Sequence, residues 1–473
     1  MLTPRFTLSQ NERHLIVHIR VPFAKISETE VEVVSNELYF YSKPYHLRLY
    51  LTGDVVEEDV ETDYQAAEAT FDIRMRKKAP GTHFPDLEMI TKLLTPPGSW
   101  RIKTIEELDA AFVTPVTENY DPTKESVASI AAGFDWHYPQ TIPPALETDG
   151  GTVQPPTSAP VHVPHKYGFG LQQSGVFHGL TEELRMVIDI KDVDSLSSEE
   201  VHAIREKIEL EAFDPDHYLA DMFCNEEIHE VMDYKPWWKD QPTSPVDVAL
   251  HGRYTEEELD ILKELPRQHL HVHPENLRAT WNTLAELVFS FAYDHRITLG
   301  EPTVESSWTV AKLSPALSCL DSLPSAEAAL LSCFRRSLCF PLYRNFELAT
   351  LVVKDVQAIF GLGRWALLKC LLAIRKMFGS TQENRYILND LYIISYCVWI
   401  QNIDEKEVAD FLTREVAKVK VEKDQLKLDL EETEAAAYLA MKEEKEGATK
   451  PRVADLEEEI AKLKMTAADS DDE

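Results

Sequence analysis

The strongest constraint on the fold of this chain is a change of hydrophobic period along its length. Residues 1–95 contain short runs in which every second residue is apolar, as in His14 to Val21 and Tyr45 to Leu51. From about residue 166 onward, apolar residues recur every three or four positions instead, as in 367–374. A period of two is typical of strands with one buried face, and a period of about 3.6 is typical of helices. The chain is therefore predicted to have an all-β part followed by an all-α part.

The N-terminal part, residues 1–95, is predicted to be an antiparallel β-sandwich of about seven strands. Turn residues such as Pro22, Ser35-Asn36 and Thr52-Gly53-Asp54 separate its runs. Several short strands at regular spacing, each with one apolar and one polar face, favour a two-layer packing of this kind.

The stretch 96–165 is predicted to be a linker, because it contains 11 prolines and no sustained period. Phe134-Asp135-Trp136 stands out within it, since aromatic residues are rare in solvated tethers. Two interpretations of this tripeptide stay open: a local contact with a neighbouring domain, and a short docking motif.

Residues 166–435 are predicted to form an all-α domain with one large core. Asp214-Pro215 is a helix start signal, with Asp as the N-cap and Pro at the first helical position. Residues 436–473 are expected to be a charged acidic tail, helical at first and disordered at its end, with a short coiled coil as an open alternative. The predicted fold is therefore multidomain: a sandwich, a Pro-rich linker, an all-α domain and a tail.

The charge of the chain is strongly negative and unevenly placed. Asp and Glu number 81 against 48 Lys and Arg, a formal net charge of −33. Residues 182–264 contain 24 acids and 8 Lys or Arg, whereas 265–403 contain 11 and 13. Phosphate contacts need positive charge, so no nucleic acid is expected to bind directly. The acidic segment is interpreted either as a solvated helical face or as a surface that binds a basic protein; Arg335 and Arg336 could also pair with it internally.

Acids and aromatics interleave in this segment, a composition typical of protein interfaces. For each aromatic, packing in the core is the alternative. The candidate charge contacts are Asp214, Asp216, Asp221, Glu226 and Glu227, and the candidate anchors are Tyr218, Trp237, Trp238 and Tyr392.

No motif in the sequence points to catalysis. Gly361-Leu362-Gly363 lacks the third glycine of a dinucleotide loop. His269, His271 and His273 alternate but have no carboxylate or Cys at a ligand spacing, and the six cysteines contain no C-x-x-C pair. We therefore expect a protein that is not an enzyme, with no cofactor and no metal, and with small buried thiols. No apolar run approaches the roughly 18 residues of a membrane span and no secretion signal is visible, so we expect a soluble intracellular chain without a membrane partner.

Several strings resemble the Shq-type H/ACA ribonucleoprotein assembly chaperones. MLTPRFTLSQ, IRVPFAKISETEVEV and YFYSKPYHLRLYL resemble their N-terminal CS-type domain. KYGFG, VIDIKD, FDPDHYLADMF, KPWW, LCFPLYRNF and ILNDLYIISYCVWIQ resemble their Shq-specific helical domain, in the same order. Together the similar regions cover residues 1–95 and 166–435.

The resemblance implies a chaperone that binds a basic dyskerin-type pseudouridine synthase over its RNA-binding surface, as an RNA mimic, before box H/ACA particles assemble. It also implies release by an AAA-type ATPase complex, and a place in the nucleoplasm and cytoplasm; a monomer is expected. A CS-type co-chaperone of a general heat-shock chaperone is the alternative function. A scaffold that acts through a coiled-coil tail is a third.

Overall fold

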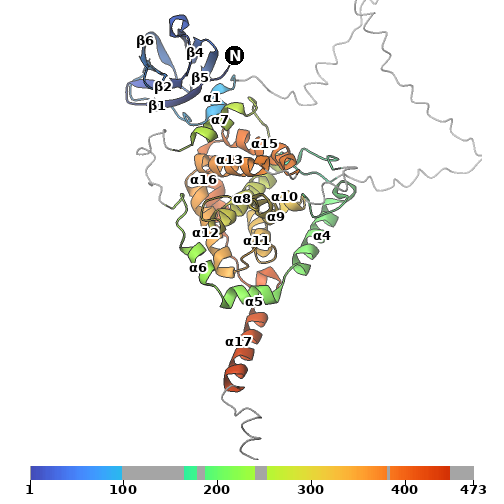
Figure 1. Cartoon of the computed structure of the whole chain (residues 1–473). Helices are drawn as coiled ribbons and strands as arrows, with labels where there is room; N and C mark the ends of the chain where they lie inside the picture. Colours follow the sequence, from blue (N-terminus) through green and yellow to red (C-terminus); the bar gives the residue numbers. More distant parts are fainter. Residues whose placement is uncertain (1, 98–164, 178–186, 240–252, 381–383, 448–473) are drawn as a thin grey trace, which may run out of the picture. The chain divides into compact units, whose positions relative to one another are not determined.

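The computed structural model describes residues 2–97, 165–177, 187–239, 253–380 and 384–447. An all-β part comes first and a mostly helical part follows (Figure 1). No helix in these described ranges is both long enough and apolar enough to cross a membrane.

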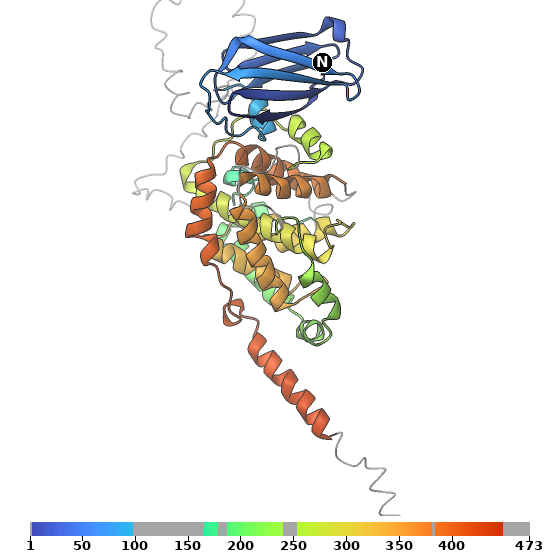
Figure 2. The same ribbon diagram turned by 90° about the vertical axis from the view of Figure 1, so that its left-hand side faces the viewer.

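Seven antiparallel strands form two sheets, which are the blue ribbons of Figure 2. One sheet has the order β1-β2-β7-β6 and the other the order β3-β4-β5. The strands are β1 (Arg5–Gln10), β2 (His14–Arg20), β3 (Glu30–Val34), β4 (Glu37–Ser42), β5 (Tyr45–Tyr50), β6 (Val55–Gln65) and β7 (Thr70–Lys77).

The alternating residues of the strands explain the sandwich. In β2, Leu15, Val17 and Ile19 are fully buried, whereas the residues between them are only partly covered. The register places Val17 opposite Ile73 of β7, so each sheet turns one continuous apolar face inward. This confirms the predicted antiparallel sandwich.

The helical part contains one long central helix and shorter helices around it (Figure 1). Its first helices are α4 (Ser198–Glu211), α5 (Pro215–Phe223), α6 (Glu226–Asp233) and α7 (Glu256–Glu264). The others are α8 (Pro274–Ile297), α9 (Ser306–Leu313), α10 (Pro315–Ser318), α11 (Ala326–Ser337), α12 (Phe346–Gly361), α13 (Arg364–Ser380), α14 (Tyr386–Leu388), α15 (Ile394–Ile400), α16 (Glu405–Arg414) and α17 (Leu430–Gly447). A short helix, α1 (Ile90–Leu94), follows the sandwich.

The central helix is α8, which is buried on every side over Thr280–Asp294. A helix that is covered all round needs neighbours on all faces, and α9, α11, α12 and α13 supply them. The predicted stripe in 367–374 falls in α13 and points into this core. The all-α prediction is therefore confirmed.

Two of the sequence predictions concern residues that the structure does not describe. Phe134-Asp135-Trp136 and the end of the tail lie outside the described residues. The predicted boundary between domain and tail, at residue 435, lies inside α17.

Candidate functional site

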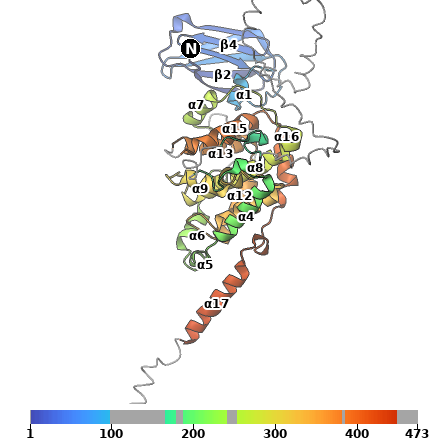
Figure 3. The same ribbon diagram turned by 90° about the vertical axis from the view of Figure 1, so that its right-hand side faces the viewer.

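Three successive helices, α4, α5 and α6, contain much of the acidic segment and lie in the lower part of the bundle (Figure 3), with α4 and α6 on opposite flanks and α5 at the bottom (Figure 1). Asp214 caps α5, where its carboxylate accepts hydrogen bonds from the backbone N–H groups of Asp216 and His217 at 3.1 and 3.2 Å. Pro215 occupies the first turn. The predicted start signal is confirmed, and it sets the direction in which α5 leaves α4.

The α5 and α6 region contains acids without matching cations. Between residues 209 and 234 the sequence has no Lys or Arg, and eight acids follow Glu209 there: Glu211, Asp214, Asp216, Asp221, Glu226, Glu227, Glu230 and Asp233. All but Asp221 are exposed. Among the described residues, one of these eight acids forms an ion pair with a Lys or Arg: the carboxylate of Glu211 lies 3.7 Å from the ammonium of Lys207.

Two of the predicted charge contacts also hold the domain together. Asp221 accepts a hydrogen bond from the backbone N–H of Arg344 and forms an ion pair with His217 at 3.4 Å. Glu227 accepts a hydrogen bond from the hydroxyl of Tyr343 at 2.9 Å. Asp216 and Glu226 are exposed in the first turns of α5 and α6. Below, the α5–α6 acidic surface means Asp216, Glu226, Glu227, Glu230 and Asp233.

The predicted aromatic anchors lie mostly in the interior. Tyr218 is 2% exposed, Trp238 3% and Tyr392 2%. Tyr218 donates a hydrogen bond to Glu434 at 2.7 Å, and Trp238 packs against Phe291. These three rings are therefore corrected to core residues, as the alternative interpretation held, because each fills a gap between helices.

Trp237 is the one predicted anchor that is only partly buried. Its ring lies 5.3 Å from that of Trp238 and 5.7 Å from that of Trp365. The ammonium of Lys369 lies over its face, 5.8 Å from the centroid. Trp237 therefore closes one edge of the aromatic core and leaves part of its ring in solvent.

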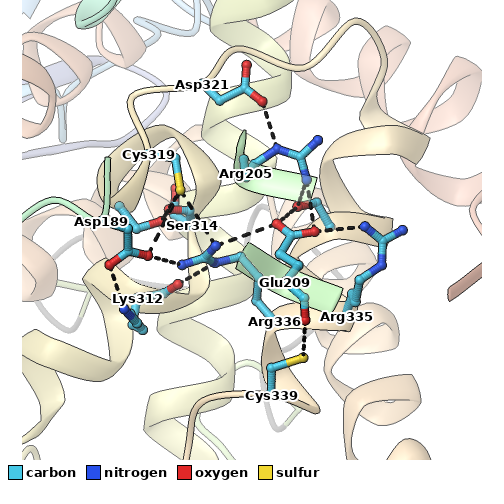
Figure 4. Close-up of polar contacts among 12 residues, drawn as sticks. Asp189, Arg205, Glu209, Lys312, Ser314, Cys319, Asp321, Arg335, Arg336 and Cys339 are labelled. Carbon is cyan, nitrogen blue, oxygen red and sulfur yellow. Dashed lines mark hydrogen bonds and ion pairs between the residues drawn. The ribbon is translucent and has the colours of Figure 1, made fainter. Parts of the chain in front are cut away.

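Part of the acidic segment is neutralised inside the domain. Figure 4 shows Glu209 of α4 among three guanidinium groups. Its carboxylate lies 2.8 Å from Arg205, 2.7 Å from Arg335 and 3.5 Å from Arg336. Arg336 also reaches Asp189 at 2.9 Å, as the dashed lines show. The predicted internal pairing of Arg335 and Arg336 with the acidic segment is therefore confirmed.

The lowered pKa of Glu209 indicates that the arginines stabilise its charged form. Burial alone would raise the pKa of this carboxyl, but Arg205, Arg336 and Arg335 together hold it below its usual value. Glu209 is thus a buried carboxylate whose charge is balanced by its neighbours. The cluster, which extends to Asp321 through Arg205 at 2.7 Å, fastens α4 to α11.

Four of the five acids of α7 also form ion pairs. Asp260 accepts a hydrogen bond from Arg5 at 2.9 Å. Glu257 forms an ion pair with Lys376, and Glu258 one with Lys369 at 3.3 Å. In the described part of residues 182–264, the unpaired negative charge is therefore concentrated on the α5–α6 acidic surface. This surface covers a smaller part of the chain than the acidic segment predicted from the sequence.

Five of the six cysteines are buried, but Cys224 is exposed, so the prediction of a buried thiol is wrong for this residue. Cys224 follows α5 and faces solvent at the turn into α6. Among the described residues, no three His, Cys, Asp or Glu side chains gather closely enough to hold a metal ion.

We expect a single fast-reacting thiol. Burial raises the pKa of Cys319 to about 11 and that of Cys397 to about 12, and a thiol reacts through its thiolate. Iodoacetamide should therefore label Cys224 first in the native protein, as peptide mass spectrometry would show. Substitution of Cys224 by Ser should remove the fast phase, and equal labelling of all six sites without denaturant would contradict this burial pattern.

Family models match both described parts of the chain. The model described as "SHQ1-like, CS domain" matches residues 3–94, and the model described as "SHQ1 protein, Shq1 domain" matches residues 245–430. The first match coincides with the β-sandwich, and the second begins after α6, so the α5–α6 acidic surface lies outside it.

Curated relatives extend the similarity over most of the chain. A mouse protein named "Protein SHQ1 homolog" is 40% identical over 94% of this chain and 77% of its own length. The zebrafish protein of the same name is 38% identical over 94% and 72%. The fission yeast protein named "Protein shq1" is 32% identical over 92% and 96%. The chain belongs to the SHQ1 family.

Proposed function

We propose that this chain is an assembly chaperone that binds a basic, dyskerin-type pseudouridine synthase over its RNA-binding surface before box H/ACA ribonucleoproteins form. Family membership suggests the client, and the α5–α6 acidic surface suggests the mode of binding. That surface is the observation that carries the proposal, because its carboxylates are exposed on two consecutive helices that contain no Lys or Arg.

The α5–α6 acidic surface is chemically complementary to a partner protein that normally binds RNA. An RNA-binding surface presents Lys and Arg side chains to phosphates. A row of exposed carboxylates offers the same sign of charge, so it can occupy such a surface in place of RNA. Glu227 and Asp221 are also fixed by hydrogen bonds, which reduces the entropy lost when a partner binds.

The proposal includes the fate of the complex. Once the client is ready for RNA, an AAA-type ATPase complex would separate the two proteins, since strong ionic contacts dissociate slowly without work. The chaperone would act as a monomer in the nucleoplasm and cytoplasm.

Reversing two charges on the acidic surface tests the proposal. The variant Glu226→Lys/Glu227→Lys is expected to bind the synthase roughly tenfold or more weakly at low ionic strength. The loss should shrink as salt is added, because salt screens exposed charges. Isothermal titration of the full chain with the purified synthase measures both effects.

The matched control is Glu30→Lys/Glu32→Lys in β3, which changes the net charge equally at two exposed positions. It should bind like the unchanged chain. Equal weakening by both variants would show that only net charge matters, and no binding by the unchanged chain would refute the proposed function.

A further inference from the structure

Apolar side chains are exposed where α5 meets α17. Phe223 at the end of α5 is 38% exposed, and on α17 Tyr438 is 59% and Met441 39% exposed. We call these three side chains the α5–α17 apolar patch. Large apolar groups that gather at one place on a surface usually mark a binding site.

The patch is held in place by its own contacts. The rings of Phe223 and Tyr438 meet edge to face, with centroids 5.5 Å apart and planes at 83°. One turn earlier on α17, Glu434 accepts a hydrogen bond from Tyr218 of α5 and forms an ion pair with Lys423 at 2.6 Å. Figure 2 shows α17 in red. Its first turns are therefore fixed to α5, and the patch is ordered before a partner arrives.

The inner face of α17 is covered by the domain only over its first turns. Leu430 is buried, and Thr433, Glu434 and Ala437 are partly buried. The same helical stripe continues with Tyr438, four residues after Glu434, and with Met441, four residues after Ala437. Both of these side chains are exposed. The stripe therefore extends past the surface that covers it.

Carboxylates share helix faces with the aromatic residues of the patch. Asp216 lies seven residues before Phe223 on α5, and Glu431 lies seven residues before Tyr438 on α17, so each acid shares a helix face with its aromatic residue. Glu226 begins α6 three residues after Phe223. Lys442 follows Met441. Negative charge therefore lies on the same helix faces as the patch, which is complementary to an apolar group flanked by basic residues.

We infer that the α5–α17 apolar patch binds a segment of the client protein in which an apolar side chain is flanked by Lys or Arg. The inference rests on the proposed function and adds to it the part of the interface that does not depend on charge. The apolar side chain inserts beside Tyr438 and Met441, and the flanking cations face Asp216, Glu226 and Glu431.

The test replaces exposed apolar side chains with polar ones of good helix propensity. The double variant Tyr438→Gln/Met441→Gln keeps α17 helical, since Gln is a good helix former. In titrations with the synthase we expect about a tenfold or larger rise in Kd. The fold change should be the same at low and high salt, unlike that of Glu226→Lys/Glu227→Lys. The control is Val304→Gln, at a site 86% exposed elsewhere on the domain, which should change Kd less than twofold.

Each outcome has a distinct meaning. If the unchanged chain binds the synthase and the double variant binds equally well, the inference is wrong while the proposed function stands. If the unchanged chain does not bind, the proposed function itself fails. If light scattering shows a dimer that the double variant converts to a monomer, a second copy occupies the patch and the inference is wrong.

Discussion

Substitution of Glu209 by Gln is expected to lower the free energy of unfolding by about 3–5 kcal/mol, the usual cost of breaking a buried ion pair from one side. Glu209 is fully buried, and its carboxylate lies within 3.5 Å of Arg205, Arg335 and Arg336. Without its charge the three guanidinium groups repel one another in a place that water does not reach. Denaturant unfolding followed by circular dichroism measures the loss.

The same helix provides a matched control for this substitution. Glu211, two residues later, is 68% exposed and lies 3.7 Å from Lys207. Its change to Gln should alter the free energy of unfolding by less than about 1 kcal/mol, as for other exposed ion pairs. Equal losses for Glu209→Gln and Glu211→Gln would show that the cluster in Figure 4 does not stabilise the domain.

The stability of the domain is expected to fall as the pH rises from mildly acidic to mildly basic. Burial raises the pKa of Glu286 from 4.5 to about 8. The folded state therefore keeps a proton that the unfolded state has lost, and the contribution of this group to stability declines between those two pH values. The difference in pKa corresponds to roughly 4–5 kcal/mol for this residue alone.

The variant Glu286→Gln should flatten this decline, because an amide does not titrate. The pKa of Asp294, raised by burial to about 7, leaves a smaller slope in the lower part of the range. Chemical unfolding at a series of pH values measures both slopes. Glu275→Gln, at an exposed position in the same helix, should leave the profile unchanged. An unaltered profile in Glu286→Gln would show that this carboxyl is not protonated in the fold.

The order of the parts could be predicted from the sequence because it depends on periodicity. The alternation in 14–21 became β2, and the stripe in 367–374 became the buried face of α13. Both patterns reflect which side of an element is apolar, and a single element is enough to reveal it.

The location of free charge was harder to predict, since it depends on which acids meet which cations in space. Glu209 and Glu226 look alike in the sequence, yet one is surrounded by arginines and the other is exposed. Arg205 and Glu209 are four residues apart, a spacing at which side chains on a helix can form an ion pair. That it would be buried against Arg335 and Arg336 depends on packing between helices that are more than 100 residues apart.

The prediction that Tyr218, Trp238 and Tyr392 are anchors at an interface was wrong for a related reason. Tyr218 and Trp238 stand among acids in the sequence, which favours an interface, but Tyr218 lies on the inner face of α5 and Trp238 lies in a turn after α6, and both side chains are buried in the core. The exposed rings of Phe223 and Tyr438 were not singled out, because their contact joins α5 to a helix that begins more than 200 residues later.

Competition between this chain and RNA for the synthase tests the central claim most directly. A labelled box H/ACA guide RNA would be titrated with the synthase at increasing concentrations of the full chain, and fluorescence anisotropy would report the RNA bound. If the acidic surface occupies the place of RNA, the apparent Kd of the RNA should rise in proportion to the concentration of the full chain, with no ternary complex on a sizing column. A ternary complex with unchanged affinity for RNA would contradict the account.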